Sequence, residues 1–399
     1  MAKNLNVPFL SESEFNSILE EKKVNIIVDC LFGTGFSGYP DEKSSEILLK
    51  VNSYDCIKIA CDIPSGINKN GFVYKNSKNE ALVFNADYTV TMGALKTALF
   101  SDVAKDFCGK IICAELGISE KVFNSLEKPS AFLLELSDIN FPFRKAKSSH
   151  KGTFGHAYVI PGEKPGAGLI AATSALEFGC GLSTVCDKFS DFSKIKIPMD
   201  LMYSSEIPNN VSAILLGSGF GRNQQNIDAA WDFIKQFSCN DKCSFVFDAD
   251  IFYYQKLPLL LQELKNQQVI LTPHPKELFY LLKLYDIKVD SVEEVIQNRF
   301  EFCKLFSEKN PNCVLVSKGA ITYICHQNQI FICDVGSVAL AKAGSGDVLA
   351  GMCLSLLAQG YDCVKAAQTA VYAHGIAASK CETNYGLTPS KLISLIKNK

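Results

Sequence analysis

Histidine, tryptophan and closely paired cysteines are scarce in this sequence of 399 residues. It has 5 histidines and 1 tryptophan, and none of its 16 cysteines has a partner at C-x-x-C spacing. Cys239 and Cys243 come closest to a metal-like spacing, and no histidine lies near them. These absences argue against a zinc module and against a disulfide framework. We therefore expect reduced, mostly buried thiols in a cytoplasmic protein.

The chain also lacks a strong charge of either sign and lacks a long apolar run. Its formal net charge is −2, so no basic field for nucleic acid or for a membrane surface is expected. No stretch approaches the ~20 apolar residues of a membrane span. No apolar run flanked by basic residues opens the chain, and we expect no signal peptide. With 47% hydrophobic residues, the composition is that of a globular protein, and the length predicts two domains.

Apolar runs that end in glycine or acid turns alternate with helical patterns in the first part of the chain. The predicted strands cover residues 24–32, 56–63, 86–92 and 110–115, with a short helix at 44–51. Continuous apolar runs separated by helices are typical of a parallel α/β sheet. The polar stretch 125–152 is interpreted as a linker, which places the domain boundary near residue 140.

The same alternation begins again at His156 and predicts a second α/β domain. Its predicted strands cover residues 156–160, 212–216, 244–248, 269–271 and 313–316, followed by a hairpin at 320–334. Several of these strands end in glycine, acid or histidine. Because ligands of open α/β sheets bind at the carboxyl ends of the strands, these residues are expected to meet in one crevice. The predicted domains are therefore 1–140 and 141–399.

A glycine-rich segment, Gly344–Asp347, precedes an apolar run at helical spacing. Such a turn leaves backbone N–H groups at the start of a helix, where they form an anion site suited to phosphate. The carboxylate of Asp347 cannot bind phosphate, but it can take a proton from a hydroxyl that attacks one. The alternative, which an isolated motif of this kind favours, is a plain glycine turn with Asp347 as a helix cap.

Other motifs at strand ends could bind a nucleotide or its co-substrate. Lys318–Thr322 offers a lysine, open backbone and a hydroxyl, His274 is fixed between two prolines, and Gly217–Gly221 allows close backbone approach. The alternatives are a solvated lysine, a histidine that caps the next helix, and a tight turn. In the first domain, Asp29 and Ser65 could hold a monovalent cation or a ribose, or Asp29 could pair with a backbone amide.

Together these motifs resemble the family of bifunctional NAD(P)H-hydrate repair enzymes. That family fuses an epimerase domain to an ADP/ATP-dependent dehydratase of the ribokinase-like superfamily. The resemblance implies a ribokinase-like α/β domain with a central, mostly parallel sheet. In the second domain it rests on six motifs in the family's order, which are His150–Gly152 with Phe154–Gly155, Pro165–Ala167, Gly217–Gly221, Leu271–Glu277, Lys318–Thr322 and Ala343–Gly351.

In the first domain the resemblance rests on Val28–Phe36, Asp62–Gly66, and Ala86–Asp87 with Thr91–Lys96. These motifs look like the later half of a Rossmann-like epimerase domain. The earlier half in that family carries an Asn-Asn-Gly-Gly-Asp loop that contacts substrate phosphates and helps to bind potassium. No such segment precedes Val24. We therefore expect a partial epimerase domain, whether from a truncated gene model, a split gene or a domain kept as a scaffold.

The resemblance implies a hydro-lyase that restores NADH or NADPH from their hydrates. It also implies that ADP or ATP, with Mg²⁺, phosphorylates the ring hydroxyl and that phosphate is then eliminated. The implied dehydratase residues are, for catalysis, Asp347, Gly344 and Gly346; for the adenine nucleotide, Lys318, Gly319, Ala320, Ile321, Thr322 and Gly346; and for the hydrate, Ala167, Gly219, Gly221, His274 and Asp347. The implied epimerase-like site is Gly33, Thr34, Gly35, Phe36, Ser37, Gly38, Tyr39 and Asp62, with K⁺ on Asp29 and Ser65.

We also expect a homo-oligomer whose partners are the hydrates NADHX and NADPHX and an adenine nucleotide. Two other functions remain open at this point. A small-molecule kinase of the same fold would share Asp347 and the anion site but would release a phosphorylated product. A non-catalytic nucleotide-binding scaffold would catalyse no reaction, and it would have no need to retain Asp347 and Lys318.

Overall fold

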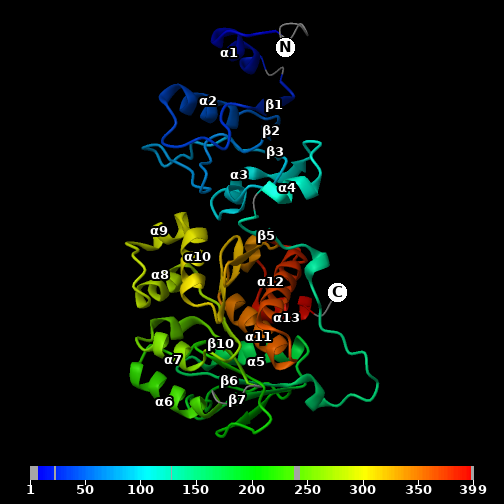
Figure 1. Cartoon of the computed structure of the whole chain (residues 1–399), viewed down its shortest axis with the longest axis vertical. Coiled ribbons are helices and arrows are strands. Elements are labelled where there is room, and N and C mark those ends of the chain that lie inside the picture. The colour runs from blue at the N-terminus through cyan, green and yellow to red at the C-terminus, as the bar shows by residue number, and fades with distance from the viewer. Residues whose placement is uncertain (1–7, 22–23, 127, 238–242, 397–399) are drawn as a thin grey trace. The chain divides into compact units, whose positions relative to one another are not determined.

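The computed structural model describes residues 8–21, 24–126, 128–237 and 243–396 (Figure 1). The chain forms two compact units, Met1–Lys128 and Pro129–Lys399. Within the described ranges, no helix has the length and apolar character needed to cross a membrane. The 15 cysteines in these ranges are free and most are buried, whereas Cys239 lies outside the described residues.

The first unit is built on a sheet of four parallel strands in sequence order. Its strands and helices are α1 (Glu12–Glu20), β1 (Ile26–Asp29), α2 (Glu42–Asn52), β2 (Ile57–Cys61), β3 (Tyr88–Met92), α3 (Lys105–Cys108), β4 (Lys110–Ala114) and α4 (Glu120–Leu126). The carboxylate of Asp41 caps α2, whose Leu48 and Val51 pack with Ala60 on one face of the sheet. The opposite face carries exposed apolar side chains, which include Ile26, Val28, Ile57 and Tyr88.

The second unit is built on a ten-stranded sheet in the order β5-β14-β13-β12-β11-β10-β9-β6-β7-β8. Its strands are β5 (Phe132–Leu133), β6 (His156–Ile160), β7 (Leu182–Cys186), β8 (Met202–Ser204), β9 (Ala213–Leu216), β10 (Ser244–Phe247), β11 (Val269–Leu271), β12 (Cys313–Ser317), β13 (Thr322–His326) and β14 (Gln329–Cys333). Strands β12 to β8 are parallel to one another, and β13 is antiparallel to both β12 and β14. The predicted α/β class with a mostly parallel sheet is confirmed.

Helix α5 (Pro165–Glu177) and the last three helices of the described chain form the main core of the second unit. Helix α5 and the helices α11 (Ser345–Ala358), α12 (Cys363–Ser379) and α13 (Pro389–Ile396) pack together and cover sheet residues such as Val246 and Val314. The remaining helices are α6 (Gln224–Ile234), α7 (Leu257–Glu263), α8 (Pro275–Leu284), α9 (Val292–Gln297) and α10 (Arg299–Lys309). Of these, α10 packs against β12 and β13. Figure 1 shows α11 and α12 in orange and red within this unit.

The strand predictions hold closely where apolar runs are long, and they fail where local signals are weak. The predicted strand 156–160 is β6, and the predicted hairpin 320–334 contains β13 and β14. The predicted linker 125–152, by contrast, contains β5, because Phe132 and Leu133 pair with the edge strand β14. Strands β7 and β8 are not indicated by the sequence pattern, because their apolar residues are interrupted by serine, threonine and tyrosine.

Candidate active site

The glycine-rich segment begins α11, and no side chain caps this helix. Gly344 is the N-cap residue in the left-handed region, at φ 88°, and a Cβ there would lie 2.5 Å from the Pro389 ring. The Ser345 hydroxyl is turned away to donate to the Leu340 carbonyl, at 2.8 Å. The alternative in which Asp347 serves as the helix cap is therefore not what the fold contains. The first turn of α11 keeps N–H groups for an anion.

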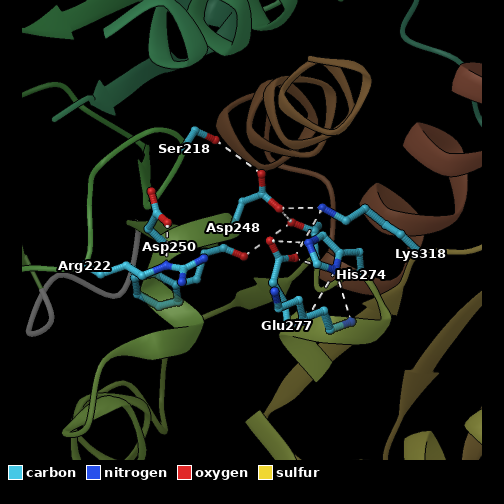
Figure 2. A network of polar contacts seen from close by, with 10 residues as sticks. Ser218, Arg222, Asp248, Asp250, His274, Glu277 and Lys318 are labelled. Carbon is cyan, nitrogen blue, oxygen red and sulfur yellow. Dashed lines mark hydrogen bonds and ion pairs between the residues drawn. The ribbon is translucent and has the colours of Figure 1, made fainter. Parts of the chain in front are cut away.

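Lys318 lies at this helix start, among carboxylates from other elements. It follows β12, and its Nζ is 2.8 Å from Asp248 Oδ1 and 3.9 Å from Glu277 Oε2 (Figure 2). The same Nζ lies 3.3 Å from the position that a Cβ would take on Gly346. Burial opposes the charged form of Lys318, but the charges of Asp248 and Glu277 outweigh burial and raise its pKa. Lys318 is therefore a firmly charged cation beside the anion site, which excludes the solvated-lysine alternative.

Asp347 is an acid with a strongly raised pKa. Burial and then the negative charge of Asp248 raise the pKa of its carboxyl, the Ser218 hydroxyl and the charge of Lys318 lower it, and the net result is a pKa of about 6. A carboxylate with a pKa near 6 is a far better proton acceptor at neutral pH than an ordinary aspartate, and it is still ionised there. This combination suits a general base.

Asp248 holds the cluster together from the end of β10. Its Oδ1 accepts hydrogen bonds from Lys318 and, at 2.7 Å, from the Thr272 hydroxyl, while Oδ2 accepts from the Ser218 hydroxyl at 3.3 Å (Figure 2). These donors provide hydrogen-bond partners for a side chain that is only 2% exposed. Asp248 was not among the predicted site residues. The signal that could have found it is the pair of acids directly after the buried strand 244–247.

The predicted hydrate residues Ala167, Gly219 and Gly221 lie together. A Cβ on Gly219 would be 2.9 Å from the Ala167 side chain, and a Cβ on Gly221 would be 2.4 Å from the Glu163 carboxyl. The turn Gly217–Gly221 therefore packs against the start of α5 and the residues just before it so closely that only glycine fits at 219 and 221. The Gly221 amide donates to Asp250 Oδ2 at 3.0 Å, so that N–H group is already used within the protein.

His274 caps α8, as the structural alternative for this residue predicts. Its Nδ1 accepts from the amides of Lys276 and Glu277, at 3.1 and 3.3 Å, and its Nε2 lies 3.1 Å from Glu277 Oε1 (Figure 2). Burial opposes ionisation of Glu277, but its hydrogen bond with His274 and the charge of Lys318 lower its pKa. His274 thus orients a carboxylate of the cluster, while 46% of its own side chain stays exposed.

Of the predicted nucleotide residues, Gly319, Ala320 and Ile321 form the turn from β12 into β13, and Thr322 is the first residue of β13. Lys318 at the start of this turn is also held by its amide, which donates to the Pro273 carbonyl at 2.9 Å. Lys318 thus joins this turn to the carboxylate cluster and to the start of α11. This is the convergence at strand ends that the sequence predicts.

The first unit has its own group of polar residues at strand ends. Asp62 follows β2 in a left-handed conformation, at φ 72°, which is uncommon outside glycine. Burial opposes its ionisation, but the Lys96 ammonium and the Met92 amide lower its pKa. The predicted residues Gly33–Tyr39 follow β1 as a largely exposed loop, in which Phe36 stacks on Phe32 at 4.7 Å.

Asp29 and Ser65 are brought together, but they bond mainly to each other. Ser65 donates its hydroxyl to Asp29 Oδ1 and its amide to Oδ2, both at 2.7 Å, and the Leu31 amide donates to Oδ1 at 3.1 Å. These bonds use about three of the four lone-pair sites of the carboxylate. The pair therefore fits the backbone-pairing alternative better than a cation site. Among the described residues, no group of three or more His, Cys, Asp or Glu side chains is arranged to hold a metal ion.

Comparison with known families and proteins identifies chains that this one resembles. A family model described as NAD(P)H-hydrate dehydratase matches residues 157–399, and one described as YjeF-related protein N-terminus matches residues 1–98. The bifunctional NAD(P)H-hydrate repair enzyme Nnr of Helicobacter pylori is 42% identical, over 96% of this chain and 77% of that protein. The enzyme of the same description from Coxiella burnetii is 30% identical, over 91% of this chain and 73% of its own length.

Solved structures resemble the second unit. The ADP/ATP-dependent NAD(P)H-hydrate dehydratase of Bacillus subtilis, crystallised with ATP and Mg²⁺, has 25% identity and a TM-score of 0.53, and the match covers 63% of this chain and 91% of that one. A ribokinase-like superfamily protein of Enterococcus faecalis has 20% identity and a TM-score of 0.53, over 67% of this chain and 94% of its own. The second of these bears on the fold alone, and it supports the predicted α/β architecture of the second unit.

Proposed function

We propose, from the premise that this chain belongs to the family of bifunctional NAD(P)H-hydrate repair enzymes, that its second unit dehydrates NADHX and NADPHX with ADP or ATP. The observation that carries the proposal is the position of Asp347. This acid has a pKa near 6 and stands on an uncapped helix start beside the Lys318 ammonium. A base, an anion site and a cation are thus in one place, as phosphoryl transfer to a hydroxyl requires.

The proposed reaction has two steps. The hydroxyl oxygen of the hydrated pyridine ring attacks the terminal phosphoryl group of the nucleotide, Asp347 takes the hydroxyl proton, and AMP or ADP leaves. The C–O bond then breaks as the ring nitrogen donates its electron pair, phosphate departs, and loss of a ring proton restores the reduced nicotinamide. Phosphorylation is needed because hydroxide is a poor leaving group. The products are NAD(P)H, phosphate and the shortened nucleotide.

The roles of the surrounding residues follow from this scheme. The amides of Gly344 and Gly346 hold the phosphoryl group as its charge shifts, and Lys318 neutralises that charge. The turn Gly319–Thr322, together with Gly346, binds the adenine nucleotide. The hydrate is bound by Ala167, Gly219 and Gly221, with His274 contributing its exposed side and orienting Glu277.

Mg²⁺ fits this site as a companion of the nucleotide. Mg²⁺ is usually bound through one or two carboxylates plus substrate phosphates, without a dedicated protein cage. The described residues hold no three-ligand metal cluster, but Asp248 and Glu277 provide carboxylates beside Lys318. When bound, the ion would supply positive charge to the phosphates.

The first unit is assigned here as an epimerase-like domain, and its activity stays a prediction. Asp62 and the loop Gly33–Tyr39 are its candidate residues. Potassium binding would require Asp29 and Ser65 to give up bonds that they make with each other. The domain boundary near residue 140 stays a prediction, which expression of the separate units would check. The homo-oligomeric state is also a prediction, which a measurement of molecular size in solution would check.

The dehydratase is tested by incubating the full chain with NADHX, Mg²⁺ and either ADP or ATP. We expect the absorbance of reduced nicotinamide to return and phosphate to be released, and we expect Asp347→Asn to abolish both. Asp232→Asn, in an exposed ion pair with Lys235, is the matched control and should act as wild type. A phosphorylated hydrate that accumulates without elimination would instead favour a small-molecule kinase. Unchanged turnover in Asp347→Asn would contradict the proposal.

A further inference from the structure

A buried guanidinium lies behind the turn that is proposed to bind the nucleotide. Arg299 is the first residue of α10 and is only 2% exposed. Its Nη1 donates to the Ser317 carbonyl at 2.9 Å and to the Ser317 hydroxyl at 3.3 Å, and its Nη2 donates to the Ile321 carbonyl. One planar group therefore ties together the two ends of the turn, immediately before Lys318 and immediately before Thr322.

The same guanidinium also fills the inside of the turn. A Cβ on Gly319 would lie 2.7 Å from the Arg299 Cζ, so the glycine leaves just enough room for the group. The Arg299 Cζ stands 4.4 Å from the centre of the Tyr323 ring, which gives the cation an aromatic floor on β13. The guanidinium is thus enclosed by the residues before, within and after the turn.

These contacts fit a positioning role better than a general contribution to the core. The Ser317 carbonyl, at the end of β12, and the Ile321 carbonyl, within the turn, both accept from Arg299, and the turn carries Lys318 into the carboxylate cluster. A planar fork with five N–H donors can bond both ends at once, whereas a lysine offers a single point of attachment. A turn that is already fixed loses less conformational freedom when a ligand binds.

We propose that Arg299 is a positioning residue for the nucleotide: it holds the turn 318–322 in the conformation that receives the phosphates. This inference rests on the proposed function, because it names the support of the same nucleotide site. Arg299 does not itself touch the reacting groups. Its loss should therefore weaken nucleotide binding selectively, and it should leave the contacts of the hydrate with Ala167 and Gly219 in place.

The test compares Arg299→Lys and Arg299→Met with Ser307→Ala. Ser307 lies on the same helix and is also buried, and its hydroxyl donates to the Gln327 carbonyl at 2.9 Å, in the turn between β13 and β14. We expect both Arg299 variants to raise the KM for ADP about tenfold or more, since Arg299→Met loses the charge-assisted bonds to both ends of the turn and Arg299→Lys can keep a bond to only one end. The KM for NADHX and the kcat should stay within about threefold. Ser307→Ala should leave all three parameters unchanged.

A double-mutant cycle separates positioning from a loss of stability. Gly319→Ala alone should raise the KM for ADP, because its methyl group pushes the pinned guanidinium away from Ser317 and Ile321. Combined with Arg299→Met, the same substitution should add little, since the obstacle is gone. Additive effects, or folded Arg299 variants with an unchanged KM for ADP, would overturn the inference.

Calorimetric titration of ADP into the wild-type protein and into Arg299→Lys tells the two proposals apart and does not depend on turnover. A wild type that binds ADP but dehydrates nothing would count against the proposed reaction alone, and weaker binding by Arg299→Lys would still support the inference. Equal binding by both folded proteins would count against the inference alone. A wild type that binds no ADP would overturn both.

Discussion

The two sheets of this protein differ in how they are covered. In the second unit, the strands β6, β9, β10, β11 and β12 are buried at every position. In the first unit, no strand is buried throughout, and Val28 and Ile57 are 57% and 48% exposed. Parallel sheets are normally covered on both faces, and only the second unit meets this rule. An apolar run in the sequence therefore predicts a strand, but the neighbours decide whether both of its faces are buried.

The same contrast separates the two acids at the strand ends. Burial and the neighbouring Asp248 raise the pKa of Asp347 to about 6, against the pull of Lys318. For Asp62, the Lys96 ammonium and the Met92 amide prevail over burial, and its pKa is lowered. Asp347 shares one lysine with two other carboxylates, whereas Asp62 has a lysine close to itself. The neighbouring charges thus give Asp347 the raised pKa of a general base and give Asp62 the lowered pKa of a paired carboxylate.

The largest expected effect comes from removing the base. Asp347→Asn should lower the kcat for dehydration by about 10³-fold, within the range that general bases contribute, and should change the KM values by only a few-fold. Asp62→Asn, which removes an acid at the other sheet, should leave this kcat unchanged. Steady-state kinetics with NADHX and ADP measure both variants. Equal losses from the two substitutions would erase the distinction between the sites.

Removing the cation should come next in size. Lys318→Met leaves Asp248 and Glu277 without their shared cation, and breaking a buried pair in this way costs about 3 kcal/mol in the free energy of unfolding. It should also raise the pKa of Asp347, because Lys318 is one of the groups that lower it. Urea unfolding and the pH profile of residual turnover measure the two effects. Lys256→Met, which breaks an exposed pair with Asp228, should cost less than about 1 kcal/mol.

A matched pair of valines tests the coverage of the sheets. Val246 is fully buried in β10, and Val28 is 57% exposed in β1. Val246→Ala should lower the free energy of unfolding by about 2 kcal/mol, through lost burial and a small cavity, and Val28→Ala by less than about 0.5 kcal/mol. Chemical denaturation of each variant provides the comparison. A large loss from Val28→Ala would mean that something covers this face in solution.

The last prediction concerns the pH dependence of dehydration. Because the pKa of Asp347 is raised to about 6, its base form is lost below that value. The kcat/KM for dehydration should be level above about pH 6.5 and fall about tenfold for each pH unit below 6. The free energy of unfolding changes in the opposite direction. Protonated Asp347 favours the folded state because its pKa is raised there, and this stabilisation is lost as the pH rises from 3.8 through about 6. A profile that is flat down to pH 5 would contradict the assignment of the base.

Much of the site could be predicted because it follows from strand ends. Lys318 and the start of α11 come directly after apolar runs or glycine turns, and parallel topology brings such ends together. The role of His274 could not be settled, since a cap and a ligand contact require the same backbone conformation between the two prolines. Arg299 gives no local signal at all: it opens an ordinary helix, and its partners Ser317 and Ile321 are defined only by tertiary packing.

The shortest strand has a consequence for biosynthesis. Phe132 and Leu133 of β5 pair with Phe331 and Ile332 of β14, about 200 residues later in the chain. At about 5 to 20 residues per second, a ribosome needs about 10 to 40 s to deliver that partner. During this interval β5 has no sheet to join, and a longer apolar strand would offer an edge to other nascent chains. A strand of two residues is too short to be an effective template, so the last edge of the sheet can be completed late without a strong tendency to aggregate.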